Sequence, residues 1–93
     1  MTTSDVIARE VVVHGIVQGV FFRSSCQQKA QRADVSGWAR NESDGTVRAH
    51  FEGPRLEVES MVAWCQRGPR HAMVDRVDVT EREPSGLRGF DLG

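Results

Sequence analysis

The residues best suited to chemistry lie in one stretch, from His14 to Arg23, which reads His-Gly-Ile-Val-Gln-Gly-Val-Phe-Phe-Arg. Its glycines, Gly15 and Gly19, allow a tight turn in which backbone N–H groups approach another group closely. N–H groups that converge in such a turn, followed by the start of a helix, bind anions and phosphate above all. Arg23 adds a planar cationic fork suited to phosphate oxygens, and the stretch has no acidic residue to repel them.

The same stretch also fits a plain strand-to-helix turn with a surface arginine, and a glycine-rich turn alone is a weak motif. It is not a Walker loop, because no Gly-Lys-Ser/Thr follows, and its glycine spacing does not match a dinucleotide-binding fingerprint. These residues by themselves therefore predict an anion site, with phosphate as the favoured ligand. The residues of the expected loop are Gly15, Ile16, Val17, Gln18, Gly19 and Val20.

Asn41 closes a second stretch of interest, which reads Gly-Trp-Ala-Arg-Asn from Gly37 onward. A side-chain amide carries both a donor and an acceptor, so it can position a water molecule. An asparagine in a turn commonly bonds its own backbone instead. The spacing alone favours this structural role over a catalytic one.

The elements that position these residues follow from the periodicity of apolar side chains. Strands are predicted over residues 9–14, 35–41, 46–52, 74–82 and 90–92, and helices over residues 23–33 and 54–67. The second and third strands form an antiparallel hairpin, and residues 1–7 are expected to be a flexible start. Two capping-box patterns, at Ser24 and Ser25, leave open a start of the first helix one turn later.

This order, β-α-β-β-α-β, predicts an α+β fold of the ferredoxin-like type. We expect a two-layer sandwich with a mainly antiparallel sheet, both helices on one face, and the other face exposed to water. The 93 residues are expected to form a single domain with a modest core. The fold alone does not indicate a function.

Composition and cysteine usage exclude several classes of function. A formal net charge of −1 gives no general attraction to nucleic acid or to an anionic membrane. The sequence has no apolar run of membrane-spanning length and no signal peptide, so we expect a cytoplasmic protein. Cys26 and Cys65 form no Cys-x-x-Cys pair and the histidines show no His-x-x-x-His spacing, so no metal site is predicted.

The two cysteines fall in the two predicted helices. Packed helix axes stay about 8–10 Å apart, whereas the Cα atoms of a disulfide lie about 4.4–6.8 Å apart. We therefore expect Cys26 and Cys65 to be free thiols that act as small core groups.

Residues 15–23 resemble the first signature of the acylphosphatases, and residues 37–41, followed by Gly45, Val47 and Gly53, resemble the second. Two long motifs in the right order are more specific than one glycine loop. The resemblance implies hydrolysis of acyl phosphates, which are mixed anhydrides of a carboxylic acid and phosphoric acid, to a carboxylate and inorganic phosphate.

Residue by residue, the resemblance implies that the N–H groups of residues 15–20 cradle the phosphate, Arg23 binds its oxygens, and Asn41 holds the attacking water. It further implies a metal-independent hydrolase without a cofactor, whose partner is the small-molecule substrate. We expect a monomer that binds neither nucleic acid nor membranes. Phosphoryl transfer suits such a site, because it depends on positioning and charge stabilisation.

Two other functions fit the same fold class. An RNA-binding module would need exposed aromatic side chains on the central strands and a basic surface, whereas Arg48 and His50 are expected to face outward there. A regulatory module that binds phosphate-bearing ligands without turnover would not need Asn41. Release of phosphate from an acyl phosphate distinguishes the enzyme from both.

Overall fold

The computed structural model describes residues 5–93, which form two helices and five strands. The strands are β1 (Val6–Ile16), β2 (Ser36–Asn41), β3 (Val47–Pro54), β4 (Met73–Arg82) and β5 (Phe90–Leu92), and the helices are α1 (Phe22–Arg32) and α2 (Arg55–Cys65). This order confirms the predicted β-α-β-β-α-β arrangement, and the short closing strand expected at residues 90–92 is present.

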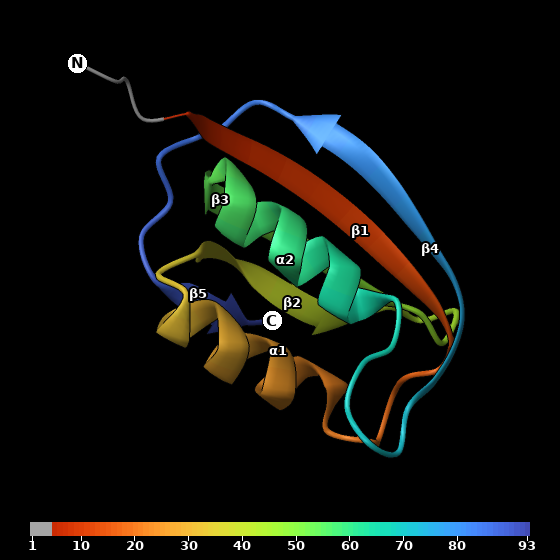
Figure 1. The fold of residues 1–93 in the computed structure, drawn as a ribbon. Helices are drawn as coiled ribbons and strands as arrows, with labels where there is room; N and C mark the ends of the chain where they lie inside the picture. Colours follow the sequence, from red (N-terminus) through yellow and green to blue (C-terminus); the bar gives the residue numbers. More distant parts are fainter. Residues whose placement is uncertain (1–4) are drawn as a thin grey trace.

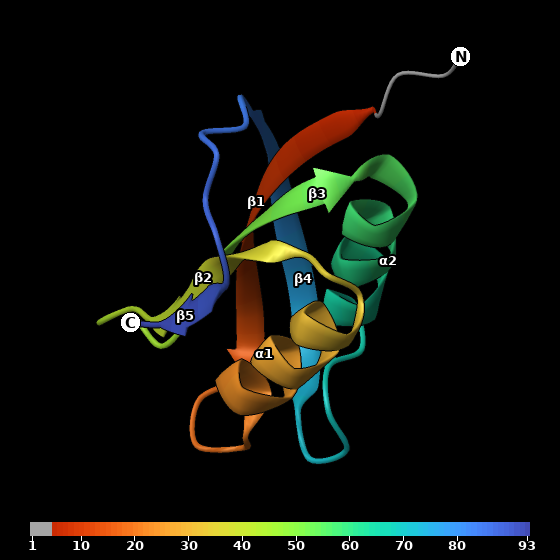
Figure 2. The ribbon, with the colours of Figure 1, turned by 90° about the vertical axis from the view of Figure 1, so that its left-hand side faces the viewer.

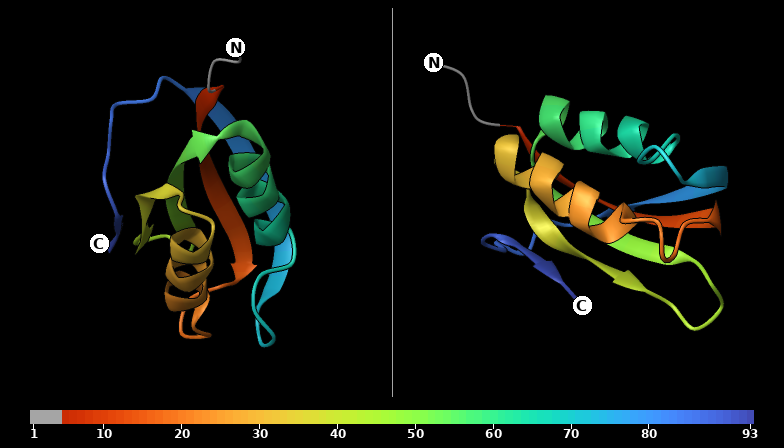
Figure 3. Two further views of the ribbon diagram at one scale, coloured as in Figure 1. Left: turned by 60° about the vertical axis from the view of Figure 1, so that its left-hand side comes forward. Right: turned by 90° about the horizontal axis from the view of Figure 1, so that it is seen from below.

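The strands form one sheet in the order β4-β1-β3-β2-β5. β1 pairs antiparallel with both β3 and β4, β2 pairs antiparallel with β3, and β5 adds a parallel edge beside β2. Both helices lie on the same face of this sheet (Figures 1 and 3). The predicted ferredoxin-like sandwich with a mainly antiparallel sheet is therefore confirmed.

The core lies between the helices and the sheet face that they cover. Its side chains recur at every second position in the strands and at every third or fourth position in the helices, as the two backbone periods require. The central buried residues are Val11 and Val13 of β1, Val47, Ala49 and Phe51 of β3, Phe22, Cys26 and Ala30 of α1, and Val58, Met61 and Cys65 of α2.

β1 begins at Val6, three residues before the predicted start. Val6 and Ile7 pair with the end of β3, and Ile7 is buried, so neither belongs to the flexible start expected for residues 1–7. The first part of that expected start, residues 1–4, lies outside the described residues. The prediction missed these two pairs because the apolar run before Arg9 is too short to show alternation.

α1 begins at Phe22, one residue before the predicted start, and no side chain caps it. The later start that the capping-box patterns left open is not adopted. Gln27, which would close one such box, instead donates a hydrogen bond to the carbonyl oxygen of Phe90 at 2.8 Å. This bond ties α1 to β5.

The sheet face opposite the helices is only partly exposed, which corrects the expectation of one wet face. His50 faces away from the helices as predicted, but it is only 8% exposed. The Trp38 ring stacks on the His50 ring with the ring centres 5.8 Å apart. Nε2 of His50 lies 2.8 Å from Oε2 of Glu52. The segment that connects β4 to β5 passes on the side away from the helices (Figure 2) and covers Glu52.

Glu52 holds this connecting segment through both carboxylate oxygens. Its Oε2 accepts hydrogen bonds from the backbone N–H of Ser85 at 2.9 Å and the Ser85 hydroxyl at 2.8 Å. Its Oε1 accepts from the N–H groups of Gly86 at 3.1 Å and Leu87 at 3.2 Å. Burial alone would raise the pKa of Glu52, but these bonds and the one from His50 lower it to about 2. The carboxylate therefore stabilises the fold above its unfolded pKa of 4.5, and this contribution is lost as the pH falls toward 2.

Cys26 of α1 and Cys65 of α2 are free and fully buried, as predicted. A hydrogen bond with Cys26 raises the pKa of Cys65 well above its ordinary value, and burial acts in the same direction. Both thiols pack in the core between the helices and the sheet.

We expect neither thiol to react with a disulfide reagent in the native protein, because both side chains are fully buried and a reagent in solution cannot reach them. Both should react after denaturation in guanidinium without a reductant. Spectrophotometric thiol titration of the native and denatured protein measures this. Fewer than two reactive thiols in the denatured sample would mean that Cys26 and Cys65 are bridged, contrary to the structure.

Candidate functional site

The end of β1 is held tightly against β4. The register between these strands shifts between His14 and Gly15, and Ile16 pairs with Met73. Gly15 has a φ of 128°, and a Cβ at this position would lie 2.1 Å from the carbonyl oxygen of Met73. Glycine is therefore required for the close approach of the two strands. Gly15 and Ile16 belong to β1, and the loop itself begins at Val17.

The loop between β1 and α1, residues 17–21, contains two left-handed backbone positions. Gly19 has a φ of 76° and Phe21 has a φ of 66°. A glycine adopts this conformation freely, whereas a residue of another type pays about 1–3 kcal/mol in strain. The Phe21 side chain is 74% exposed, so its burial does not offset the cost. Strained residues of this kind cluster at functional sites.

The N–H groups of this loop are available to a ligand. Among the turn and loop hydrogen bonds of residues 5–93, no backbone bond has an N–H of residues 17–24 as its donor. The first bond of α1 runs from the N–H of Ser25 to the carbonyl oxygen of Phe21, at 3.0 Å. The first turn of α1 also lacks acidic residues, so the positive end of its dipole is not neutralised. These free donors are what an anion site requires.

Arg23 lies in the first turn of α1 beside the loop. Its Nη1 donates a hydrogen bond to the backbone oxygen of Gly93, 3.1 Å away. Gly93 is itself held, because its N–H donates to the carbonyl oxygen of Ala39 at 2.9 Å. A guanidinium has five N–H donors, so this bond orients the group and leaves donors for an anion.

A pocket of about 270 Å³ lies where the loop, the start of α1 and the end of β2 meet. Val17 and Gly19 of the loop line it, together with Phe21, Arg23 and Asn41. Asn41 is the last residue of β2 and is exposed at the rim. The structure therefore brings the predicted cation, the predicted amide and part of the predicted loop to one pocket.

The remaining loop residues hold the loop in place. Val17 is 1% exposed and anchors the loop in the core, and Val20 packs partly against the same core. The Gln18 amide donates to the carbonyl oxygens of Glu42 at 2.8 Å and Thr46 at 2.9 Å. These carbonyl groups flank the β2–β3 turn, so Gln18 joins the loop directly to the hairpin that carries Asn41.

Gln18 thus ties the loop to the hairpin through contacts that the sequence motif does not indicate. Its partners lie 24 and 28 positions away along the chain, and no local pattern predicts such contacts. The signal available in the sequence was only that a long amide side chain stands in a loop otherwise made of apolar residues and glycines.

A larger hollow of about 780 Å³ is lined by Arg9, Arg55 and Arg82, but it does not include the loop, Arg23 or Asn41. Each of its three arginines lies within 3.8 Å of a carboxylate oxygen. Their charges are already compensated, so the smaller pocket is the better candidate for binding phosphate.

No group of three or more His, Cys, Asp or Glu side chains in residues 5–93 is arranged to hold a metal ion. Among the residues that line the pocket, Arg23 is the cationic one. No helix in the described part of the chain is long and apolar enough to span a membrane.

Comparison with known proteins establishes the family. The family model described as Acylphosphatase matches residues 9–92. The chain belongs to the acylphosphatase family. An acylphosphatase from Natronomonas pharaonis is 47% identical over 89 residues, which cover 96% of this chain and 97% of that relative. The resemblance of the two signature stretches is therefore confirmed over nearly the whole chain.

Solved structures extend the same conclusion to the fold. An acylphosphatase from Coxiella burnetii superimposes with a TM-score of 0.92 at 33% identity, covering 100% of both chains. One from Bacillus subtilis gives a TM-score of 0.89 at 33% identity, covering 94% of this chain and 98% of that one. The chain is an acylphosphatase that hydrolyses acyl phosphates, and a non-catalytic phosphate-ligand or RNA-binding module is not favoured.

We expect Gln18→Ala to lower kcat/KM for an acyl phosphate by roughly ten- to hundredfold, because small displacements of a positioned group have effects of this size. Loss of two hydrogen bonds should also destabilise the acylphosphatase by about 1–3 kcal/mol. Steady-state kinetics and urea unfolding measure the two effects. Gln31→Ala, at an exposed position of α1, is the control and should change neither. Unchanged kinetics for Gln18→Ala would rule out the positioning role.

Proposed function

We propose that the free N–H groups of the loop and of the first turn of α1, together with Arg23, hold the phosphate of the substrate. The Asn41 amide positions the attacking water. The observation that supports these roles is the convergence of loop, guanidinium and amide on one pocket. The cradle is drawn from residues 17–20, since Gly15 and Ile16 are paired with β4.

The proposed reaction suits a site made of fixed dipoles and one cation. A transferred phosphoryl group passes through a loose transition state whose charge is spread over three equatorial oxygens. Donors that are already oriented stabilise this charge without reorganisation. The leaving group is a carboxylate, which is a weak base, so the reaction needs little help from a general acid.

The water attacks phosphorus while the bond from phosphorus to the acyl oxygen breaks. The amide oxygen of Asn41 accepts a hydrogen bond from this water and directs its lone pair toward phosphorus. An amide is too weak a base to remove the proton, so a phosphate oxygen of the substrate accepts it. The products are a free carboxylate and inorganic phosphate.

The proposal also covers the conditions in which the acylphosphatase works. It needs no metal ion or cofactor, because Arg23 and the loop supply the positive field. It acts as a monomer in the cytoplasm on a small-molecule substrate and binds neither nucleic acid nor membranes. The net charge of −1 supports the last point.

Two substitutions separate the proposed roles. Asn41→Ala removes a contact to water only, so kcat should fall by about 10²–10³-fold while the Ki of inorganic phosphate stays unchanged. Arg23→Gln removes a contact to phosphate in both the ground and transition states, so kcat should fall and Ki should rise. Measurements of kcat on an acyl phosphate and of Ki for phosphate provide the test.

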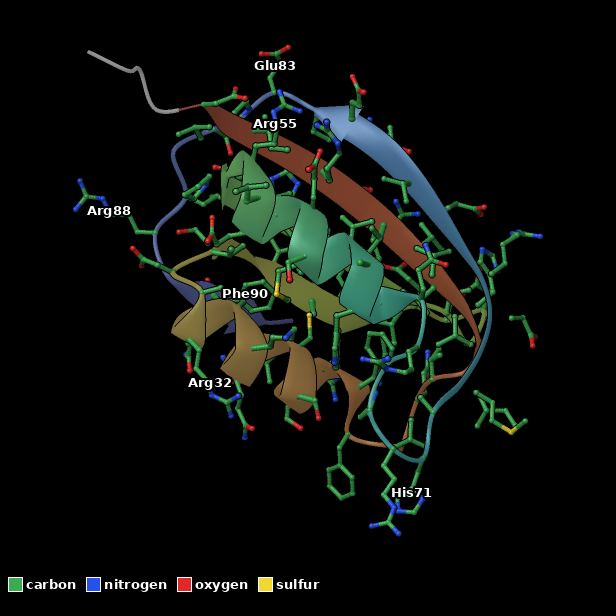
Figure 4. The ribbon with its side chains drawn as sticks, viewed as in Figure 1. Arg32, Arg55, His71, Glu83, Arg88 and Phe90 are labelled. Carbon is green, nitrogen blue, oxygen red and sulfur yellow. The ribbon has the colours of Figure 1, made fainter. Side chains whose placement is uncertain are left out.

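Arg32→Gln is the matched control for the arginine, since Arg32 lies at the other end of α1 and points away from the molecule (Figure 4). It should leave both constants unchanged. Circular dichroism of each variant checks that the fold is retained. Normal turnover by Asn41→Ala, or a loss of phosphate affinity as large as that of Arg23→Gln, contradicts the proposed role of the amide.

Removal of metal ions tests the source of the positive field. Activity on an acyl phosphate should be unchanged after dialysis against EDTA, because the charge that faces the phosphate belongs to Arg23. The measurement compares dialysed enzyme with and without added magnesium. Loss of activity on dialysis and its recovery with magnesium would show that a metal ion supplies part of the field.

A further inference from the structure

We propose that Glu52 is a positioning residue for catalysis, which holds the Arg23 guanidinium in place through the connecting segment, residues 83–89, and the closing strand β5. The proposal rests on the phosphate-binding role assigned to Arg23. Glu52 contacts neither the pocket nor Arg23, so its effect would travel through three sets of contacts.

The first set joins Glu52 to the connecting segment. Its carboxylate accepts four hydrogen bonds from Ser85, Gly86 and Leu87, at 2.8 to 3.2 Å. Its side chain is only 5% exposed, although the connecting segment itself lies on the surface. Three consecutive backbone N–H groups thus point at one buried carboxylate, which fixes the path of a segment that has no helix or strand.

The second set joins the connecting segment to β5. The carbonyl oxygen of Gly89 accepts a hydrogen bond from the N–H of Gly37 at 2.9 Å. The next residue, Phe90, is 4% exposed, stacks with its ring centre 6.0 Å from that of Phe51, and accepts the bond from Gln27 of α1. Figure 4 shows Phe90 directly beside α1. The path fixed by Glu52 therefore decides where β5 begins.

The third set joins β5 to Arg23. β5 pairs with β2 over three residues, and this short parallel pairing has little stability of its own. Directly after it, the backbone oxygen of Gly93 accepts the bond from Arg23 at 3.1 Å. If residues 85–87 were released, β5 would be held only by its own contacts with β2, α1 and Phe51, and the partner of Arg23 would be less firmly placed.

Glu52→Gln tests the first link with little change in volume. A glutamine side chain has one oxygen that accepts and one NH₂ group that donates, so it cannot accept from Ser85 and from Gly86 and Leu87 at once. We expect the Kd of inorganic phosphate, measured by NMR titration, to rise about five- to tenfold, within the range for coupled residues. Hydrogen exchange of the Gly93 amide should accelerate in the same variant, and kcat should change less than KM.

A double-mutant cycle with Arg23→Gln shows whether the effect passes through the guanidinium. Glu52→Gln should weaken phosphate binding in the wild-type background and have no further effect in the Arg23→Gln background. Equal effects in both backgrounds, or an unchanged Kd in the single variant, would overturn the proposal. The cycle measures phosphate binding and does not require turnover. If the wild-type protein bound phosphate without hydrolysing an acyl phosphate, the proposed catalysis would be wrong, and the cycle would still test the role of Glu52.

Glu10→Gln is the matched control. Glu10 lies on the same sheet face, its side chain is 13% exposed, and it bonds Arg48 and Arg82 rather than the connecting segment. It should lower stability without changing phosphate affinity. If Glu52→Gln does not fold, Ser85→Ala replaces it as the test, because it removes one of the four bonds at an exposed position. We expect a smaller rise in the Kd of phosphate, and no rise in the Arg23→Gln background. An unchanged Kd for Ser85→Ala would then count against the proposal.

Discussion

The pocket between the loop and Asn41 depends on the register in which β1, β3 and β2 pair. Val47 at the start of β3 lies opposite Val13 of β1 on one side and Asn41 of β2 on the other. This row places the end of β1, from which the loop continues, one strand away from Asn41. A slip of one residue would turn every side chain of β3 to the other face. Burial of Val47 and Phe51 therefore fixes the distance between the loop and the amide.

Local patterns in the sequence were sufficient to predict the order of the elements. With the signature resemblance they also led to four of the residues that line the pocket, Val17, Gly19, Arg23 and Asn41. The alternation of β3 and the helical spacing of α1 each reflect one buried face, so neither requires knowledge of the tertiary fold. Gln18 and Glu52 could not be predicted in this way. The Gln18 amide donates hydrogen bonds to carbonyl groups of the hairpin. The alternation of β3 predicts that Glu52 faces outward, but in the structure residues 85–87 cover it. Both sets of contacts join segments that are distant in the sequence.

The loop also contains features that are unfavourable in a folded chain. Phe21 adopts a left-handed backbone that favours glycine, and the N–H groups beside it donate to no backbone carbonyl within residues 5–93. Such a loop is unfavourable by itself, so it must be held by its surroundings. Val17 in the core and the Gln18 amide on the hairpin do this from opposite sides. A bound phosphate would satisfy the free donors without further rearrangement.

The bond from Arg23 to Gly93 is best understood as a matter of orientation. It is exposed to water, and contacts of this kind contribute little to stability. A free arginine side chain, however, carries about 2 kcal/mol of rotamer entropy that binding must remove. A partner that holds the guanidinium before the substrate arrives removes part of this cost in advance. The closing strand adds only three residues to the sheet, but the residue that follows it is the partner of the Arg23 guanidinium at the pocket.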